Sequence, residues 1–194
     1  MAAPLTRSDL MSLEQYAQQR NDFRKKVIAH KKHRRVGIGP NLFLYFEDRL
    51  TIQYQIQEML RIEKIFEADG IQEELDTYNP LIPDGYNLKA TAMLEYQDVT
   101  ERKRQLALLR GIEDLIWIQV DGFERIYAIA NEDLERSNAE KTSAVHFMRF
   151  ELETDMIAAL KNGANLLVGT NHEMYQLGEI VDENSRIALL QDLD

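Results

Sequence analysis

Residues 143–152 carry a histidine and an arginine on opposite faces of one expected strand. Alternation places His146 on one face with Met148 and Phe150, and Arg149 on the other. A histidine on an apolar face is usually a hydrogen-bonded core residue. The alternative is a general base or an iron ligand, so His146 and Arg149 are candidate ligand-binding residues.

A second candidate group lies on one side of a long helix expected over residues 48–68. Tyr54, Glu58 and Arg61 fall at positions i, i+4 and i+7, which a helix brings to the same side. A buried Glu–Arg pair beside a tyrosine can bind a polar ligand or shift the pKa of an acid. The alternative is an ordinary salt bridge beside a packed ring. With the two strand residues above, this group predicts a polar pocket between the helix and the sheet.

Several catalytic chemistries are excluded by residue type. The chain has no cysteine, which excludes a disulfide, a thiol nucleophile and Cys-ligated zinc or iron–sulfur centres. His30 and His33 share a helix face, but the surrounding cations repel a metal ion, so no metal site is predicted there. A glycine-rich phosphate loop, Gly-x-Ser-x-Gly and His-Glu-x-x-His are all missing. The cofactor stays unknown, and whether the chain is an enzyme stays open.

The charge of the chain is unevenly distributed. The formal net charge is −10, yet residues 24–35 hold seven Lys or Arg, two His and no acid. Such a run indicates an anionic partner, or an acidic surface that the run meets within or outside the chain. The acidic remainder of the chain repels phosphates, so nucleic acid is disfavoured as the partner. The partner-binding candidates are Arg24, Lys25, Lys26, Lys31, Lys32, Arg34 and Arg35.

The first part of the chain is expected to be mainly helical. Ser12 begins a capping box for a first long helix, which carries the basic run at its C-terminal end. Asp48 is a plausible N-cap for the second long helix, which we expect Gly70 to end. Between the two helices, the glycines and the proline of residues 36–40 end the first helix. An aromatic-rich strand follows, and its residues Leu42–Phe46 could serve as an edge for a homodimer.

Strand patterns dominate from residue 90 onward. The order β-α-β-β-β-α-β over residues 90–170, with an Asp121-Gly122 hairpin turn, predicts an α+β fold. We expect a mostly antiparallel sheet, with the two long N-terminal helices packed as a flanking layer. A single domain is expected over residues 1–194, made of a helical part (8–78), a sheet part (88–172) and an acidic tail (178–194).

Bulk composition predicts a soluble, cytoplasmic protein. The chain is 44% hydrophobic and 29% charged, which is ordinary for a globular domain. The N-terminus lacks an apolar segment of signal-peptide length, and no window approaches 18 apolar residues, so no membrane span is expected.

Five stretches of the sequence carry a resemblance: AHKKHRR (29–35), FEDRLTIQYQIQEMLRIE (46–63), GIED (111–114), GFERIYAIA (122–130) and EKTSAVHFMRFEL (140–152). Together they resemble a bacterial family known as domain-of-unknown-function family 3501. Members of that family are often encoded beside a rubrerythrin-like protein and an iron–sulfur oxidoreductase. The resemblance therefore implies an accessory part in peroxide or electron-transfer chemistry, and it implies no catalytic residues.

Two hypotheses of function follow. The first is a non-catalytic accessory protein whose basic run docks a redox partner, either the iron–sulfur oxidoreductase or the rubrerythrin-like protein. The second is a small-ligand binder or enzyme that uses the polar pocket between the second long helix and the sheet. We favour the first, because a chain without cysteine cannot hold an iron–sulfur cluster itself.

Overall fold

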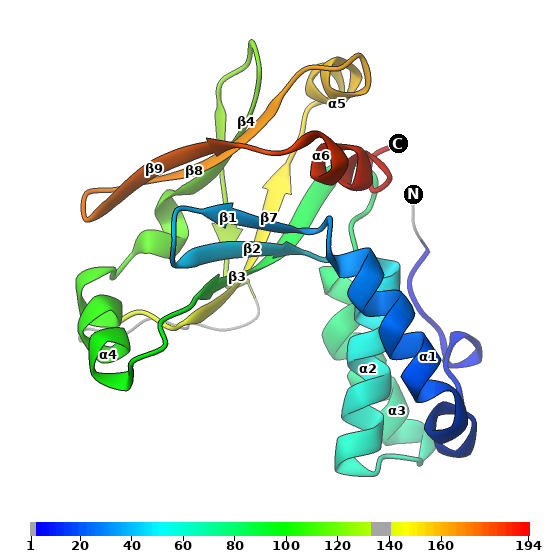
Figure 1. Ribbon diagram of the computed structural model, residues 1–194. Coiled ribbons are helices and arrows are strands. Elements are labelled where there is room, and N and C mark those ends of the chain that lie inside the picture. The colour runs from blue at the N-terminus through cyan, green and yellow to red at the C-terminus, as the bar shows by residue number, and fades with distance from the viewer. Residues whose placement is uncertain (1–2, 133–140) are drawn as a thin grey trace.

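The computed structural model describes residues 3–132 and 141–194, which form a helical arm and a body of two sheets (Figure 1). The helices are α1 (Leu13–Lys31), α2 (Arg49–Glu63), α3 (Ala68–Tyr78), α4 (Val99–Leu108), α5 (Thr154–Lys161) and α6 (Glu183–Leu190), with short turns η1 (Arg7–Asp9), η2 (Asn79–Leu81) and η3 (Ile112–Leu115). The strands are β1 (Arg35–Ile38), β2 (Leu42–Phe46), β3 (Asn87–Leu94), β4 (Ile116–Val120), β5 (Arg125–Tyr127), β6 (Ile129–Ala130), β7 (Val145–Glu151), β8 (Leu166–His172) and β9 (Tyr175–Ile180). The α+β fold class is confirmed.

The strands form two antiparallel sheets rather than one. The first has the order β1-β2-β3-β7-β6, and the second has the order β5-β4-β8-β9. Strand alternation sends one set of side chains from each sheet into a shared core. That core includes Leu44, Phe46 and Phe150 from the first sheet and Ile118 and Val168 from the second.

The two sheets are joined at both edges. After the predicted Asp121-Gly122 turn, residues 123–130 do not form a single strand. They split into β5 of one sheet and β6 of the other, so the chain crosses between the two sheets. At the opposite edge, the Tyr175 hydroxyl donates to the Ile38 carbonyl at 2.8 Å and accepts from the Asn41 amide at 3.0 Å. The edge strands β1 and β9 therefore lie side by side.

Strand β2 is an interior strand of its sheet. It pairs with β1 on one side and with β3 on the other. The prediction that Leu42–Phe46 offers a free edge for a homodimer is therefore wrong. Strand β1 was missed because Gly37 and Gly39, both within residues 36–40, predicted an irregular break after the helix. In the structure, Gly37 lies inside β1, and Gly39 (φ +65°) makes the turn of the hairpin to β2.

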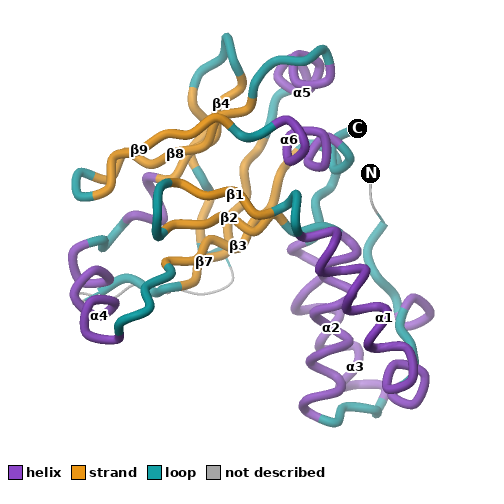
Figure 2. Tube along the Cα trace, viewed as in Figure 1, coloured by secondary structure: helices purple, strands orange, loops and turns teal. Residues whose placement is uncertain are grey.

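Helices α1, α2 and α3 form an arm that projects from one end of the body, rather than a layer over a sheet (Figures 1 and 2). The arm has an apolar core of its own, made by Leu5, Ile52, Ile56, Leu60, Leu75 and Ile82. Its caps are as predicted, since the Ser12 hydroxyl accepts from the Gln15 amide and the Asp48 carboxylate accepts from the Thr51 amide. The second helix, however, ends at Glu63 with Lys64 in the left-handed region (φ 57°), and Gly70 lies inside α3.

The tail differs from the expected one. Residues 175–180 form strand β9, and α6 follows. Five of the six residues of β9 are exposed, so the strand lacks the alternation of buried and exposed positions by which a strand is predicted. Across residues 3–132 and 141–194, no helix combines the length and the apolar character needed to span a bilayer.

Candidate functional site

The basic run divides into residues bound within the chain and residues facing solvent. The side chain of Arg34 is 1% exposed, and its two terminal nitrogens donate to the carboxylate of Asp192 at 2.8 and 2.5 Å. One of them also lies 3.0 Å from Asp48 Oδ2. Since Asp48 caps α2 and Asp192 follows α6, Arg34 ties the base of the arm to the C-terminal segment. Part of the acidic surface that the run meets therefore lies within the chain.

The two carboxylates around Arg34 respond differently to their surroundings. Burial raises the pKa of Asp192 to about 7. The neighbouring negative charge of Asp48 adds to this rise, and the attraction of Arg34 acts against it. Burial also acts to raise the pKa of Asp48, but Arg34, the Thr51 amide and His30 together lower it. His30 Nε2 lies 2.5 Å from Asp48 Oδ2. The buried cluster thus holds two carboxylates that compete for one guanidinium.

Arg35 also binds within the chain. Its guanidinium lies 3.6 Å above the ring centre of Phe43, and its Nε donates to the Tyr45 hydroxyl at 2.8 Å. The nearest carboxylate is that of Glu95, at 3.4 Å. Arg34 and Arg35 are therefore structural parts of the arm base and of the first sheet, which leaves the residues of α1 as the free part of the basic run.

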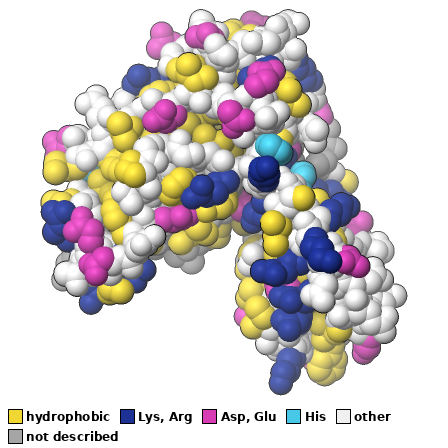
Figure 3. All heavy atoms as spheres, viewed as in Figure 1, with side chains coloured by type: hydrophobic (Ala, Val, Ile, Leu, Met, Phe, Trp, Pro, Cys, Tyr) yellow, Lys and Arg dark blue, Asp and Glu magenta, His cyan; other side chains and the backbone are white. Residues whose placement is uncertain are grey.

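The exposed side of α1 presents an isoleucine surrounded by cations. Ile28 is 56% exposed. Arg24 and Lys32 lie four residues away from it and Lys25 and Lys31 three residues away, so all four border it on the helix surface. We call these five residues the Ile28 patch. Figure 3 shows Lys and Arg side chains gathered along this arm.

The cations of the Ile28 patch are little used by acids of the chain. Lys25 contacts Asp22 at 3.3 Å, and both of these side chains are largely exposed. In the part of the chain that the structure describes, no carboxylate forms an ion pair with Arg24, Lys31 or Lys32. Lys26, two residues before Ile28, points to the other side of the helix. The patch is therefore a cationic surface with an apolar centre.

Glu58 lies in a closed network between α1 and α2. Its carboxylate accepts two hydrogen bonds from Arg20, at 2.7 and 2.8 Å, and one from the hydroxyl of Tyr16 at 2.6 Å. The Arg20 hydrogen bonds are the main reason why the pKa of Glu58 falls to about 2, which leaves it ionised and unable to act as an acid. Tyr54 packs its ring against Phe23, and Arg61 is exposed. The predicted partners Tyr54 and Arg61 are thus replaced by Tyr16 and Arg20.

His146 is a buried, hydrogen-bonded residue of β7. Its Nε2 lies 2.9 Å from Thr142 Oγ1 and 3.0 Å from the Ser143 carbonyl, and its Nδ1 lies 3.0 Å from the Asn131 amide nitrogen. Thr142 in turn donates to Glu113 at 2.9 Å. The Ser143 carbonyl can only accept, so Nε2 carries a proton and donates to it. With 2% exposure, the ring behaves as a core residue rather than as an accessible base.

A cleft of about 930 Å³ separates α3 and η2 from the outer face of the first sheet. Lys89 and Arg149 line it from the sheet, together with apolar side chains from both of its walls. Of the five ligand-binding candidates, Arg149 is the residue that lines this cleft, while Tyr54, Glu58 and Arg61 lie on the arm and His146 points into the body. The predicted pocket against the second long helix is therefore replaced by a cleft against the third.

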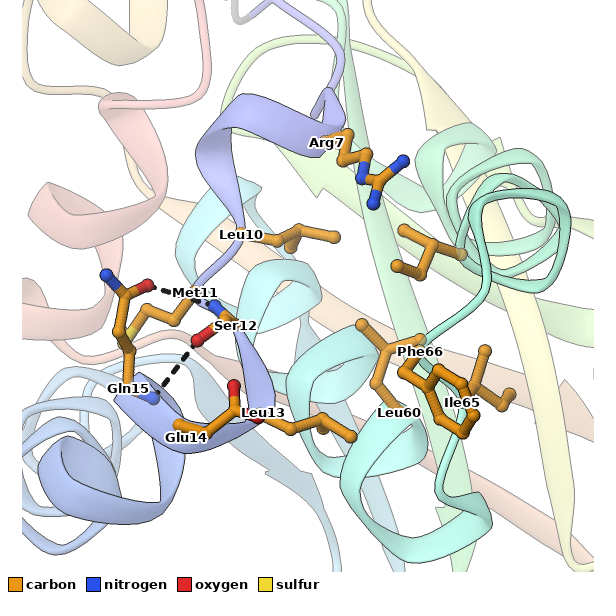
Figure 4. A pocket seen from close by; sticks show the side chains of 11 residues that line it. Arg7, Leu10, Met11, Ser12, Leu13, Glu14, Gln15, Leu60, Ile65 and Phe66 are labelled. Atoms are coloured by element: carbon orange, nitrogen blue, oxygen red, sulfur yellow. Dashed lines mark hydrogen bonds between the residues drawn. The ribbon is translucent and has the colours of Figure 1, made fainter.

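A second pocket, of about 550 Å³, opens at the tip of the arm. Leu10, Leu13, Leu60, Ile65 and Phe66 line it, and the Ser12–Gln15 capping box closes one side (Figure 4). Leu60 belongs to the arm core, so the pocket is an outward continuation of that core. Within residues 3–132 and 141–194, no group of three or more His, Asp or Glu side chains is placed to hold a metal ion.

The model of protein family DUF3501, a family of unknown function, matches residues 4–193. The chain belongs to this family. It is also similar to a crystal structure of a novel protein of unknown function from Burkholderia pseudomallei, with 54% identity, a TM-score of 0.94, and coverage of 99% of this chain and 100% of the other. No curated protein matches the chain at a significant level.

In this DUF3501 member, several residues that build the sites escaped the sequence analysis. Arg20 and Asp192 pair with residues 38 and 158 positions away, and such distant pairs leave no local pattern. Lys89 carried a usable signal, since a lysine inside an otherwise apolar strand marks the solvent side of that strand. Ile28 had one as well, because its position among cations on α1 excludes it from the buried face.

Proposed function

We propose that this protein is a non-catalytic binding protein that docks an acidic protein partner through the Ile28 patch. The observation that carries the proposal is an exposed isoleucine bordered by four cations on a projecting arm, in a chain whose net charge is −10. Cations gathered at one place on an otherwise acidic chain create a local positive potential, which attracts an acidic surface.

The two components of the patch have different tasks. Cations at the rim of an interface steer association and select a complementary partner, and they add modest affinity. Burying the remaining exposed surface of Ile28 adds on the order of 1 kcal/mol. The combination fits an acidic protein surface with a shallow apolar depression, whereas the acidic body of the chain disfavours a wide anionic membrane surface.

For the partner itself, we propose the redox proteins that the family resemblance implies, a rubrerythrin-like protein or an iron–sulfur oxidoreductase in the cytoplasm of a bacterium. The chain without cysteine supplies no iron–sulfur ligands, so its contribution is to bind and position the partner. The saturated Glu58 and the buried His146 support an accessory role over a catalytic one. A homodimer, if it forms, uses a surface other than β2.

The test compares two variants with equal loss of charge. The patch variant carries Arg24→Ala, Lys25→Ala, Lys31→Ala and Lys32→Ala. The control variant carries Lys26→Ala, Arg102→Ala, Lys103→Ala and Lys161→Ala, which lie outside the patch. Binding to a rubrerythrin-like protein and to an iron–sulfur oxidoreductase from the same organism is measured by calorimetry.

We expect the patch variant to bind one of these redox proteins about tenfold or more weakly than the unmodified chain does, through the loss of rim charge. The control variant retains its affinity. Equal affinities for the two variants, or no binding of either redox protein by the unmodified chain, contradict the proposal.

A further inference from the structure

The floor of the cleft between α3 and the first sheet contains two cations that face each other across neighbouring strands. Lys89 of β3 and Arg149 of β7 are direct partners in the antiparallel register. Like charges placed opposite one another destabilise a sheet unless an anion lies between or beside them. This position therefore requires a negative charge from elsewhere.

Glu151 of the same strand and Glu132 supply that charge to Arg149. Glu132 binds it through both of its oxygens. Its two carboxylate oxygens accept from Arg149 Nε at 2.9 Å and from Arg149 Nη2 at 2.7 Å, the two-pronged geometry with which a guanidinium binds any carboxylate. The Glu132 side chain is 53% exposed, whereas Arg149 is about half as exposed. An exposed carboxylate on a fixed guanidinium can be exchanged for another anion at little cost.

Lys89 is held in a fixed position on the same floor. Its ammonium donates to the carbonyls of Pro80 at 2.7 Å and Ile82 at 2.9 Å, so the side chain is tied to the connector after α3. Burial lowers the pKa of Lys89, partly offset by Asp84. The Asp84 carboxylate is itself engaged by the Tyr86 amide and by the side chain of Asn87. Glu151, the second carboxylate on Arg149, is held in addition by the side-chain amide of Asn87 at 3.1 Å. Among the acids near Arg149 and Lys89, Glu132 is thus the one whose place a ligand can take.

The walls of the cleft are apolar above this charged floor. Tyr78 and Leu81 line it from the arm, and Ile129 and Phe147 line it from the sheet. Ile129 is 41% exposed, so a ligand gains hydrophobic contact there. The volume of about 930 Å³ is within the range of small-molecule sites.

We propose that this cleft binds a small organic anion, whose acidic group takes the place of the Glu132 carboxylate on Arg149 and whose apolar body packs against Ile129 and Phe147. The site is separate from the Ile28 patch, and it rests on different observations. It gives the protein a small-ligand function in addition to partner docking.

The probe is 8-anilinonaphthalene-1-sulfonate, an aromatic anion whose fluorescence rises in an apolar site. Three variants are compared with the unmodified chain: Arg149→Gln, Glu132→Gln, and the control Arg125→Gln, whose guanidinium stacks on Trp117 of the other sheet. Phe66→Ser is introduced in all four proteins, including the otherwise unmodified chain that serves as the reference, to remove binding at the arm tip. Circular dichroism verifies that each variant is folded.

We expect one bound probe per chain, bound about tenfold more weakly by Arg149→Gln and several-fold more tightly by Glu132→Gln, since the competing carboxylate is gone. The Arg125→Gln control binds as the unmodified chain does. 2-Naphthoate displaces the probe, and 2-naphthylmethanol, which has the same ring without the charge, does not.

Each opposite outcome overturns the inference. No binding by the unmodified chain excludes an anion site in the cleft. Equal affinity of Arg149→Gln, or equal displacement by the alcohol, means that the probe senses apolar surface alone. If Arg149→Gln does not fold, Glu132→Gln decides the matter, and an affinity that is unchanged or weakened in that variant contradicts the proposed exchange.

Discussion

At the scale of single residues, the buried charges of this protein are mostly structural. Arg34 is shared by Asp48 and Asp192, and Glu58 is saturated by Arg20 and Tyr16. Such clusters are costly to break because the remaining charge stays buried without its partner. They hold the arm together and fix it to the body, and they leave the surface charges of α1 to act on other molecules.

The Arg34 cluster makes stability depend on pH. Because the pKa of Asp192 rises to about 7 in the folded protein, the folded state holds its proton more tightly than the unfolded chain does. The stabilisation from this proton is fully present below about pH 4 and is lost as pH rises through about 7. We expect Asp192→Asn, which carries no titrating group, to lack this loss. Relative to Asp192→Asn, the unmodified chain loses on the order of 2–4 kcal/mol between pH 5 and pH 8.

Urea unfolding of both proteins at pH 5 and pH 8 measures that difference. Both proteins keep the other charged side chains of the cluster, so the comparison isolates the contribution of Asp192. If the unmodified chain instead gained stability over Asp192→Asn as pH rises, the ion pair with Arg34 would outweigh burial and the raised pKa would be wrong.

The Glu58 network tests the structural against the functional interpretation. Glu58→Ala leaves the Arg20 guanidinium and the Tyr16 hydroxyl without their acceptor, and we expect a loss of about 2 kcal/mol of unfolding free energy. Glu63→Ala, at the exposed end of the same helix, is the control with a negligible effect. Thermal unfolding measures both. A Glu58→Ala variant that kept its stability but lost partner or probe binding would return Glu58 to the list of functional residues.

At the scale of elements, the sequence predicted those that carry their own local signal. The helices capped by Ser12 and Asp48 were found because a capping box is contained within four residues. The end of α2 was misplaced because Lys64 adopts the left-handed conformation that ends the helix. That conformation is expected of glycine or asparagine, so a lysine gives no signal for it. Strand β1 and strand β9 were missed because each is short or polar and is stabilised by pairing with a neighbour distant in the chain.

The grouping of the candidate site residues differs from the predicted one for a related reason. Helical spacing correctly brought Glu58 to a buried seam, but it could only offer partners on the same helix, whereas the true partners come from α1. For Arg149, alternation gave the correct side of β7, and the cleft depends on how the arm meets the sheet. Tertiary placement decides these contacts, and no pattern within one element contains it.

The turn between β1 and β2 allows a prediction at this scale. A Cβ atom at Gly39 would lie 2.4 Å from Leu177 Cδ1, in a backbone conformation with φ +65°. We expect Gly39→Ala to cost about 2–3 kcal/mol, from backbone strain and from overpacking against β9. Gly122→Ala has a similar positive φ of +88° with open space around it, so strain alone costs about 1 kcal/mol. Equal melting temperatures for the two variants would contradict this prediction, because they would mean that Leu177 of β9 moves away from the added methyl group without cost.

At the scale of the whole molecule, the arm and the body have separate apolar cores, joined at the base of the arm by the Arg34 cluster. This division gives the protein two surfaces of different chemistry. The arm carries the cationic Ile28 patch, and the junction of arm and sheet forms the cleft with Arg149 on its floor. The two proposed sites, one for a partner protein and one for a small anion, therefore lie on different surfaces.

The central claim is that the patch on α1 docks an acidic protein, and the salt dependence of that binding tests it most directly. For the unmodified chain, we expect the affinity for the redox partner to fall about tenfold between 50 and 300 mM NaCl, because salt screens exposed charges. The patch variant should bind weakly at both salt concentrations, with little dependence on salt, while the matched control follows the unmodified chain. An affinity that is independent of salt in the unmodified chain, or a salt dependence that persists in the patch variant, would contradict the account.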